Sequence, residues 1–405
     1  MNSGSSAIDL YNCLKRVISE KNIPFTNLIG FISDSCNVMF GNHNSVYSLL
    51  KADAPNIVCI KCSCHLIHLA ASKACMILPR SVEDLLRNVG SHFSRSAGRQ
   101  ERFKDFQEFF KTDIHRILLP SNTRWLSLKQ CVDRTLEQYN PLEAYFREEV
   151  FRDPSKTTED ILNTFANKFN IVYLEFMSYT LGLLTEFNIL FQSETALLYK
   201  LKPETATLLR TLCANFMKRE KTSNKNVFDL NHKNPDFFCS LDQIYLGIAA
   251  NESIADLKNN ASENEVTLFL KNCLQFYIEL VSQIKKRFVF DDDVFDIVSI
   301  VDPMNAQSFS VRTLAKVTKR FPILKECINC QELDNEWRDH AHIDFKEMGM
   351  DPTKTAEEYW KQVFEFRNRA GVAHENITLD ILPGLTDQYI RELAPSRQLS
   401  VIKFD

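Results

Sequence analysis

The chain has 405 residues, of which 44% are apolar and 25% charged, an ordinary globular composition with room for two or three domains. Its ten glycines and thirteen prolines are too few for the many turns of a β-sandwich or propeller, which favours a helix-rich protein. The net charge of -4 excludes a uniformly basic coat for nucleic acid, and twelve cysteines are too dilute for a disulfide scaffold.

The first eighty residues alternate between helical and strand patterns. Apolar residues at three-four spacing predict a helix over 8–20, and short apolar runs predict strands over 27–33 and 56–60. Further helices are expected over 44–50 and 62–77. This order is typical of parallel strands covered by helices, so we predict a small α/β part at the start of the chain.

Beyond residue 80 the sequence contains no convincing strand pattern. Helices are predicted at 81–111, 123–139, 161–200, 237–250, 263–287, 310–319, 332–341 and 357–369. The fold class is therefore expected to be mainly α with a small α/β part. No run reaches about 18 apolar residues, so we expect no membrane span, no secretion, and reduced thiols in the nucleus or cytosol.

An acidic residue follows the first predicted strand. Asp34 comes directly after the apolar run that ends at Ser33, and small and polar residues follow up to Gly41. Ligands of α/β proteins bind at the carboxyl ends of parallel strands, and a carboxylate there can hold Mg²⁺ or Mn²⁺. The alternative is that Asp34 caps the next turn or helix, which the spacing alone favours.

Cysteines and histidines gather where the second predicted strand passes into a helix. Zinc binds such side chains, but a structural zinc site usually takes two ligand pairs from separated segments. The distant pair Cys327 and Cys330 would have to fold close to supply the second pair. The pattern therefore favours a packed structural cluster over zinc, and its members are Cys59, Cys62, Cys64, His65 and His68.

A third motif places Arg124 and Trp125 in the first turn of a predicted helix, behind a capping Thr123. A guanidinium can bind a phosphate, and an indole can stack on an unpaired base. The surrounding stretch 80–134 carries eleven basic and seven acidic residues, a surplus that a DNA-backbone groove needs. The alternative is a core tryptophan beside a surface arginine on an ordinary solvated helix.

The order and spacing of these motifs resemble the hAT superfamily of DNA transposases, in particular its domesticated zinc-finger-BED-like and zinc-finger-MYM-like animal relatives. Cys62 and His65 match the family's CxxH motif, and Arg124 and Trp125 match its Arg-Trp motif. The resemblance covers nearly the whole chain, including a late EYW, and is strongest over 27–130. It implies an RNase H-like domain interrupted by a large helical insertion.

The resemblance also implies an acidic site. Three acids of the family bind divalent metal for DNA strand cleavage and transfer; Asp34 matches the second, and Glu332 or Glu336 is the candidate third. The first acid and the BED-type zinc finger would precede Met1, and after about residue 370 the chain departs from the family's dimerisation signature. We therefore expect a truncated or domesticated derivative.

Three domains are expected: a partial RNase H-like domain over 1–140, a helical insertion over 141–305, and a C-terminal helical part over 306–405 with a remnant of the dimerisation region. The leading hypothesis is a catalytically inactive, nuclear, transposase-derived protein. It would need no cofactor, and Mg²⁺ or Mn²⁺ would bind at Asp34 only if activity remained.

Partners follow from the same hypothesis. We expect weak, sequence-independent DNA binding through Arg124 and Trp125, or binding to protein partners or a second copy of the chain. One alternative is an incomplete gene model of an active metal-dependent transposase. The other is a helical protein-interaction platform that does not bind DNA.

Overall fold

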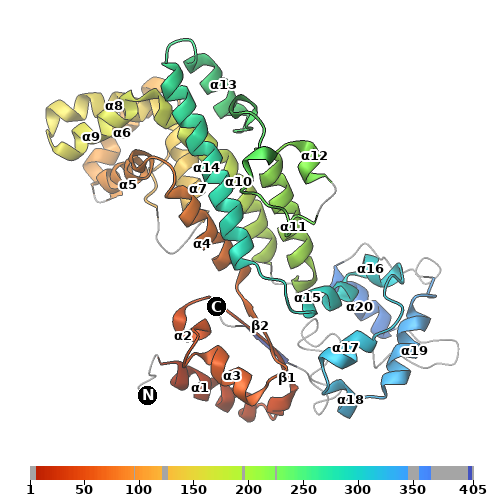
Figure 1. Cartoon of the computed structure of the whole chain (residues 1–405). Coiled ribbons are helices and arrows are strands. Elements are labelled where there is room, and N and C mark those ends of the chain that lie inside the picture. Colours follow the sequence, from red (N-terminus) through yellow and green to blue (C-terminus); the bar gives the residue numbers. More distant parts are fainter. Residues whose placement is uncertain are drawn as a thin grey trace. The chain divides into compact units, whose positions relative to one another are not determined.

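The computed structural model describes residues 6–94, 96–120, 126–193, 197–223, 226–344, 355–365 and 400–403. Helices dominate it, and its strands form one small parallel sheet (Figure 1), which confirms the predicted mainly α fold with a small α/β part. None of the described helices is both long and apolar enough to cross a membrane.

The chain forms two compact units. The sheet unit comprises Met1–Leu66, Phe191–Glu204 and Val289–Asp405, and the helical unit comprises Ile67–Leu190 and Thr205–Phe288. Each unit is therefore built from segments that are far apart in the sequence. The boundaries of these compact units differ from the domain boundaries predicted at 140 and 305. The three-domain division stays a prediction.

The sheet has the order β2-β1-β3, and both strand pairs are parallel. β1 (Leu28–Ser33) and β2 (Val58–Lys61) lie where the sequence predicts strands, with Gly30 opposite Val58. β3 (Ser400–Lys403) pairs with the other side of β1. The sequence analysis finds no convincing strand pattern beyond residue 80, so β3 corrects that expectation.

Three helices accompany the first two strands: α1 (Ala7–Glu20), the short α2 (Asn37–Phe40) and α3 (Val46–Asp53). Ser6 and Ser45 accept backbone N–H groups at the starts of α1 and α3, as N-caps do. The buried faces of α1 and α3 pack with β1 in one apolar cluster, which includes Tyr11, Leu14, Ile18, Leu28, Phe31, Val46 and Leu50.

A second core of the sheet unit is built from the late helices α15 (Val294–Ile297), α16 (Pro303–Gln307), α17 (Ala315–Arg320), α18 (Leu324–Cys327), α19 (Cys330–His340) and α20 (Ala356–Glu365). The rings of His340, Trp337 and Trp360 are in mutual contact: His340 lies 5.5 and 5.1 Å from the two indoles, and the indoles lie 6.4 Å from each other. Both indole N–H groups donate to backbone carbonyls, those of Val311 and Val301. The aromatic residues of EYW are therefore core residues.

Two long helices of the helical unit, α10 (Lys168–Phe191) and α14 (Glu263–Arg287), run parallel to each other. Tyr173 contacts Phe269, and Phe176 contacts Phe276, with centroids 4.7 and 5.2 Å apart. Figure 1 shows them beside α7 (Leu126–Glu137), α12 (Arg219–Thr222) and α13 (Ile248–Leu257) of this unit. The helices α4 (Ser63–Cys75) and α11 (Leu198–Ala214) begin in the sheet unit and continue into the helical unit.

The remaining helices of this unit are α5 (Arg80–Ser94), α6 (Ala97–Phe110), α8 (Tyr139–Arg152) and α9 (Lys156–Ala166), which pack against one another. Their shared core is aromatic: Tyr145 is in ring contact with Phe93, Phe103 and Phe146, and Phe93 also contacts Phe103. Aromatic pairs of this kind contribute about 0.5–1.5 kcal/mol each beyond the area they bury.

A carboxylate is buried at the edge of this aromatic core. The side chain of Glu149 is 3% exposed, and both its oxygens accept from the Arg102 guanidinium at 3.0 Å. Arg99 lies 3.7 Å from the same carboxylate and forms a 2.7 Å ion pair with Asp153. Two guanidinium groups thus compensate the buried charge of Glu149.

Candidate functional site

The carboxyl end of β1 presents Asp34 to solvent. One carboxylate oxygen accepts the backbone N–H of Cys36 at 3.1 Å, so the side chain closes the turn that leads into α2. The thiol and N–H of Cys36 and the charge of His65 lower the pKa of Asp34, against the effect of partial burial. Asp34 is therefore an ionised turn-capping residue, the role that its spacing favours.

The carboxyl end of β2 leads directly into α4. The backbone N–H of Cys62 donates to the carbonyl of Ser33 at 2.7 Å, which ties this end of β2 to the end of β1. The Cys62 carbonyl in turn accepts the N–H of Leu66 at the start of the helix. Asp34 and the CxxH motif therefore lie at one edge of the sheet.

The thiol of Cys62 lies at the N-terminus of α4. The Cys64 thiol, the N–H groups of His65 and Cys64, and the charge of His65 lower the pKa of Cys62 to about 6, against the opposing effect of burial. Helix N-termini stabilise thiolates in this way. Because His65 also influences Asp34, it lies near both residues. Cys62 and His65 are each half-buried.

The candidate third acids lie on α19 of the sheet unit. Glu332 is exposed in the first turn, where the Asn329 side chain accepts its N–H at 3.4 Å. Glu336 is half-buried, one position before the core residue Trp337. In the described part of the chain, neither joins Asp34 in a group of three ligand side chains whose donor atoms lie within 4.8 Å of one another.

The Arg124–Trp125 motif lies outside the described residues, but the basic stretch around it is largely visible. Seven of its nine described basic side chains form ion pairs with acidic neighbours, and Lys111 and Arg116 have no such pair among the described residues. The seven are Arg80, Arg87, Arg99, Arg102, Lys104, Lys129 and Arg134. The predicted basic surplus is therefore mostly compensated on the protein itself.

A pocket of about 590 Å³ opens in the helical unit between α4, α5 and the beginning of α7. Its charged lining residues pair with each other, Arg80 with Asp84 and Arg87 with Glu83. The other described lining residues are partly apolar and partly polar, so the pocket has no net charge that would favour an anion or a cation.

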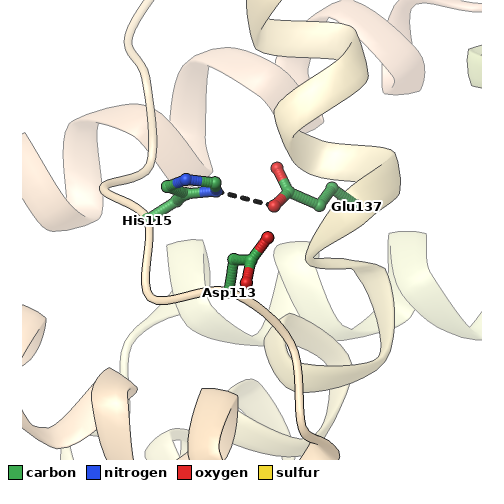
Figure 2. Close-up of side chains that lie close together, drawn as sticks. All are labelled: Asp113, His115 and Glu137. Atoms are coloured by element: carbon green, nitrogen blue, oxygen red, sulfur yellow. Dashed lines mark hydrogen bonds and ion pairs between the residues drawn. The ribbon is translucent and has the colours of Figure 1, made fainter.

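Sequence reasoning misses one group of side chains altogether. Asp113, His115 and Glu137 bring one potential ligand atom each to within 4.8 Å of the others (Figure 2). Asp113 and His115 lie in the irregular segment after α6, and Glu137 is the last residue of α7. The one available signal, Asp-x-His, is too short to identify a site without its distant carboxylate.

Comparison with protein-family models, with curated proteins and with solved structures finds no match to this chain.

Proposed function

We propose that the chain is a catalytically inactive derivative of a hAT-type DNA transposase, which acts in the nucleus and keeps a weak, sequence-independent affinity for DNA. The observation that carries this proposal is the parallel pair β1–β2, which gathers Asp34, Cys62 and His65 at one edge. The division of the sheet unit by helical segments agrees with the interrupted RNase H-like domain that the resemblance implies.

The surroundings of Asp34 support the proposal that the protein does not cleave DNA. Metal-assisted strand transfer uses carboxylates that converge on two ions, and in the described residues Asp34 has no such company. We expect no nicking of supercoiled DNA by the purified protein in Mg²⁺ or Mn²⁺. Metal-dependent nicking that Asp34→Asn abolishes would overturn this expectation.

DNA affinity is tested by the fluorescence anisotropy of labelled random-sequence duplex. We expect binding at about 50 mM salt that falls steeply as salt rises, with a slope of about -0.9 per neutralised phosphate. Arg124→Ala should weaken every sequence equally, whereas Arg152→Ala, at an exposed pair with Glu148, should have no effect. No detectable binding at the lowest salt overturns the DNA part of the proposal.

The substitution Trp125→Ala tests whether the indole stacks on DNA bases or packs in the protein core. If the indole stacks on bases, Trp125→Ala weakens single-stranded DNA more than duplex, because stacking contributes about 1–3 kcal/mol per base. The circular dichroism spectrum should then be unchanged. Lost helicity would instead identify Trp125 as a core residue.

A second function, a protein-interaction platform without DNA affinity, is favoured by the ion pairs described above. The compensated basic side chains leave less charge for phosphates. Two phenylalanines of the helical unit, Phe109 and Phe151, are 80% and 88% exposed. This function predicts that the protein does not bind DNA but self-associates on a size-exclusion column. The variants Phe109→Ser and Phe151→Ser should then lose the self-association.

A further inference from the structure

Three side chains of different chemistry converge beside the end of α7. The Nδ1 atom of His115 lies 2.6 Å from a carboxylate oxygen of Glu137, and the Asp113 carboxylate approaches both (Figure 2). The His115 and Glu137 side chains are 42% and 35% exposed, so an ion from solvent can reach them. A nitrogen donor between two carboxylates is a mixed set of the kind that holds transition-metal ions.

Buried amides hold the backbone that carries two of these groups. The Gln107 side chain donates to the carbonyl of His115 at 2.9 Å, and that of Gln138 donates to the carbonyl of Asp113 at 3.0 Å. The two amides are joined by a 2.9 Å hydrogen bond, and both residues are at most 1% exposed. The positions of Asp113 and His115 are therefore fixed by the protein before any ion binds, which reduces the ordering cost of binding.

The charges at this place favour a cation. Two carboxylates lie beside one imidazole, so oxygen ligands with negative charge outnumber the nitrogen donor. Arg134 opposes this, because its guanidinium contacts the second oxygen of Glu137 at 2.9 Å. The first oxygen of Glu137 stays in contact with His115, and Nη1 of Arg134 donates to the carbonyl of Arg116.

We propose that Asp113, His115 and Glu137 form a binding site for one divalent transition-metal ion, with Zn²⁺ as the expected occupant. One imidazole and two carboxylates suit Zn²⁺, whereas Mg²⁺ prefers oxygen ligands alone. Three protein ligands leave a fourth position for water, as in zinc sites that are open to a ligand. This site lies in the helical unit and is independent of the proposed DNA function.

The test is Zn²⁺ titration calorimetry of the full chain, with protein stripped of metal. We expect one ion per chain, and His115→Ala or Glu137→Gln should lower the affinity about tenfold or more. His43→Ala, at an exposed histidine of the sheet unit, is the matched control and should leave the affinity unchanged. Because His115 and Glu137 are partly exposed, unchanged circular dichroism is expected for both variants.

The thiols around Cys62 are the competing zinc ligands, so the same titration is repeated with Cys62→Ser. Zn²⁺ binding that persists in Cys62→Ser and is lost in His115→Ala supports the proposal. Loss in Cys62→Ser, or a thiolate-to-metal absorption band when Co²⁺ replaces Zn²⁺, overturns it. Absence of any binding to the wild-type chain overturns it as well.

Discussion

Cys62 shows how a local backbone arrangement changes the chemistry of a single residue. Its pKa is lowered to about 6, whereas burial raises the pKa of Cys59 to about 11 and that of Cys213 to about 12. The pKa of Cys62 is lowered chiefly by the hydrogen bond with the Cys64 thiol, and further by the N–H groups of His65 and Cys64 at the helix N-terminus.

We predict that iodoacetamide modifies Cys62 with a rate that is half-maximal near pH 6, because the thiolate is the reactive form. Peptide mass spectrometry after short exposures measures it, with the buried Cys213 as the unreactive reference. Cys64→Ala should move the midpoint upward, since the Cys64 thiol is the largest stabilising contribution. A rate that rises only above about pH 8, as for an ordinary thiol, would contradict the described geometry.

Glu149 provides the second prediction at this scale. Arg102→Ala removes the guanidinium that contacts both carboxylate oxygens and leaves a nearly inaccessible charge with Arg99 alone at 3.7 Å. We expect a loss of about 3 kcal/mol in the free energy of unfolding, measured by urea denaturation. Arg147→Ala, which breaks an exposed pair with Glu143, should change it by less than about 1 kcal/mol. Equal effects would show that Glu149 is solvated.

At the scale of elements, the sequence predicts the regular parts of the fold well. The helix at 8–20 and the strands at 27–33 and 56–60 appear as α1, β1 and β2 with small shifts at their ends. The helix has apolar residues at three-four spacing and the cap Ser6 before it, and the strands are short continuous apolar runs.

Three predicted helices are wrong in their extent. The helix expected over 81–111 is divided between α5, which ends at Ser94, and α6, which begins at Ala97 behind the extended N-cap Ser96. The helix expected over 161–200 is broken after α9 at Asn167, whose side chain accepts the N–H of Phe169. The helix expected over 237–250 begins only at Ile248, after Gly247 with a φ of 91°. Upstream, the N–H of Tyr245 donates to the carbonyl of Asn215 and holds the chain in an extended course. Tertiary hydrogen bonds override the local pattern here.

Some features of the candidate sites follow from the local sequence, and others depend on tertiary contacts. The position of Asp34 at the end of a strand follows from the apolar run before it, whereas its proximity to His65 depends on the pairing of β1 with β2. The sequence does not predict the group of Asp113, His115 and Glu137. The irregular segment that carries Asp113 and His115 is held by side-chain hydrogen bonds from Gln107 and Gln138, and such tertiary contacts leave no local pattern in the sequence.

Gly90 of α5 gives a prediction about how that irregular segment is placed. A Cβ at Gly90 would lie 2.7 Å from the carbonyl oxygen of Leu118 and 2.8 Å from the Cα of Leu119, so only glycine allows this close approach. Gly90→Ala should therefore destabilise the protein by about 1–3 kcal/mol in urea, although alanine is the better helix former. Gly98→Ala in α6, with nothing within 4 Å, should instead stabilise it by up to about 1 kcal/mol.

At the scale of the whole molecule, two buried histidines make stability depend on pH. Burial, aided by Arg99, lowers the pKa of His92 to about 4, and burial, aided by Lys285 and Lys233, does the same for His232. The His92 ring hydrogen-bonds to the Tyr145 hydroxyl, and the His232 ring hydrogen-bonds to the Ser282 hydroxyl. In the unfolded chain both histidines take up protons near pH 6.5.

We therefore predict that stability is greatest above about pH 6.5 and falls as the pH is lowered to about 4. The folded pKa lies below the unfolded one, so protons favour the unfolded chain, by on the order of 3 kcal/mol for each histidine. Urea denaturation across this range measures the slope. The double variant His92→Gln and His232→Gln should flatten it, and His43→Gln should not.

The discontinuous sheet unit has a consequence for the order of events during protein synthesis. Its first segment ends at Leu66, but the core helices that complete it belong to Val289–Asp405, including Arg320, which donates to the carbonyl of Asn56. At about 5–20 residues per second, a ribosome needs roughly 10 to 45 seconds to make the intervening chain. Throughout that interval the nascent β1 and β2 lack their later partners, and the edge of β1 that β3 covers stays open to pairing with other chains.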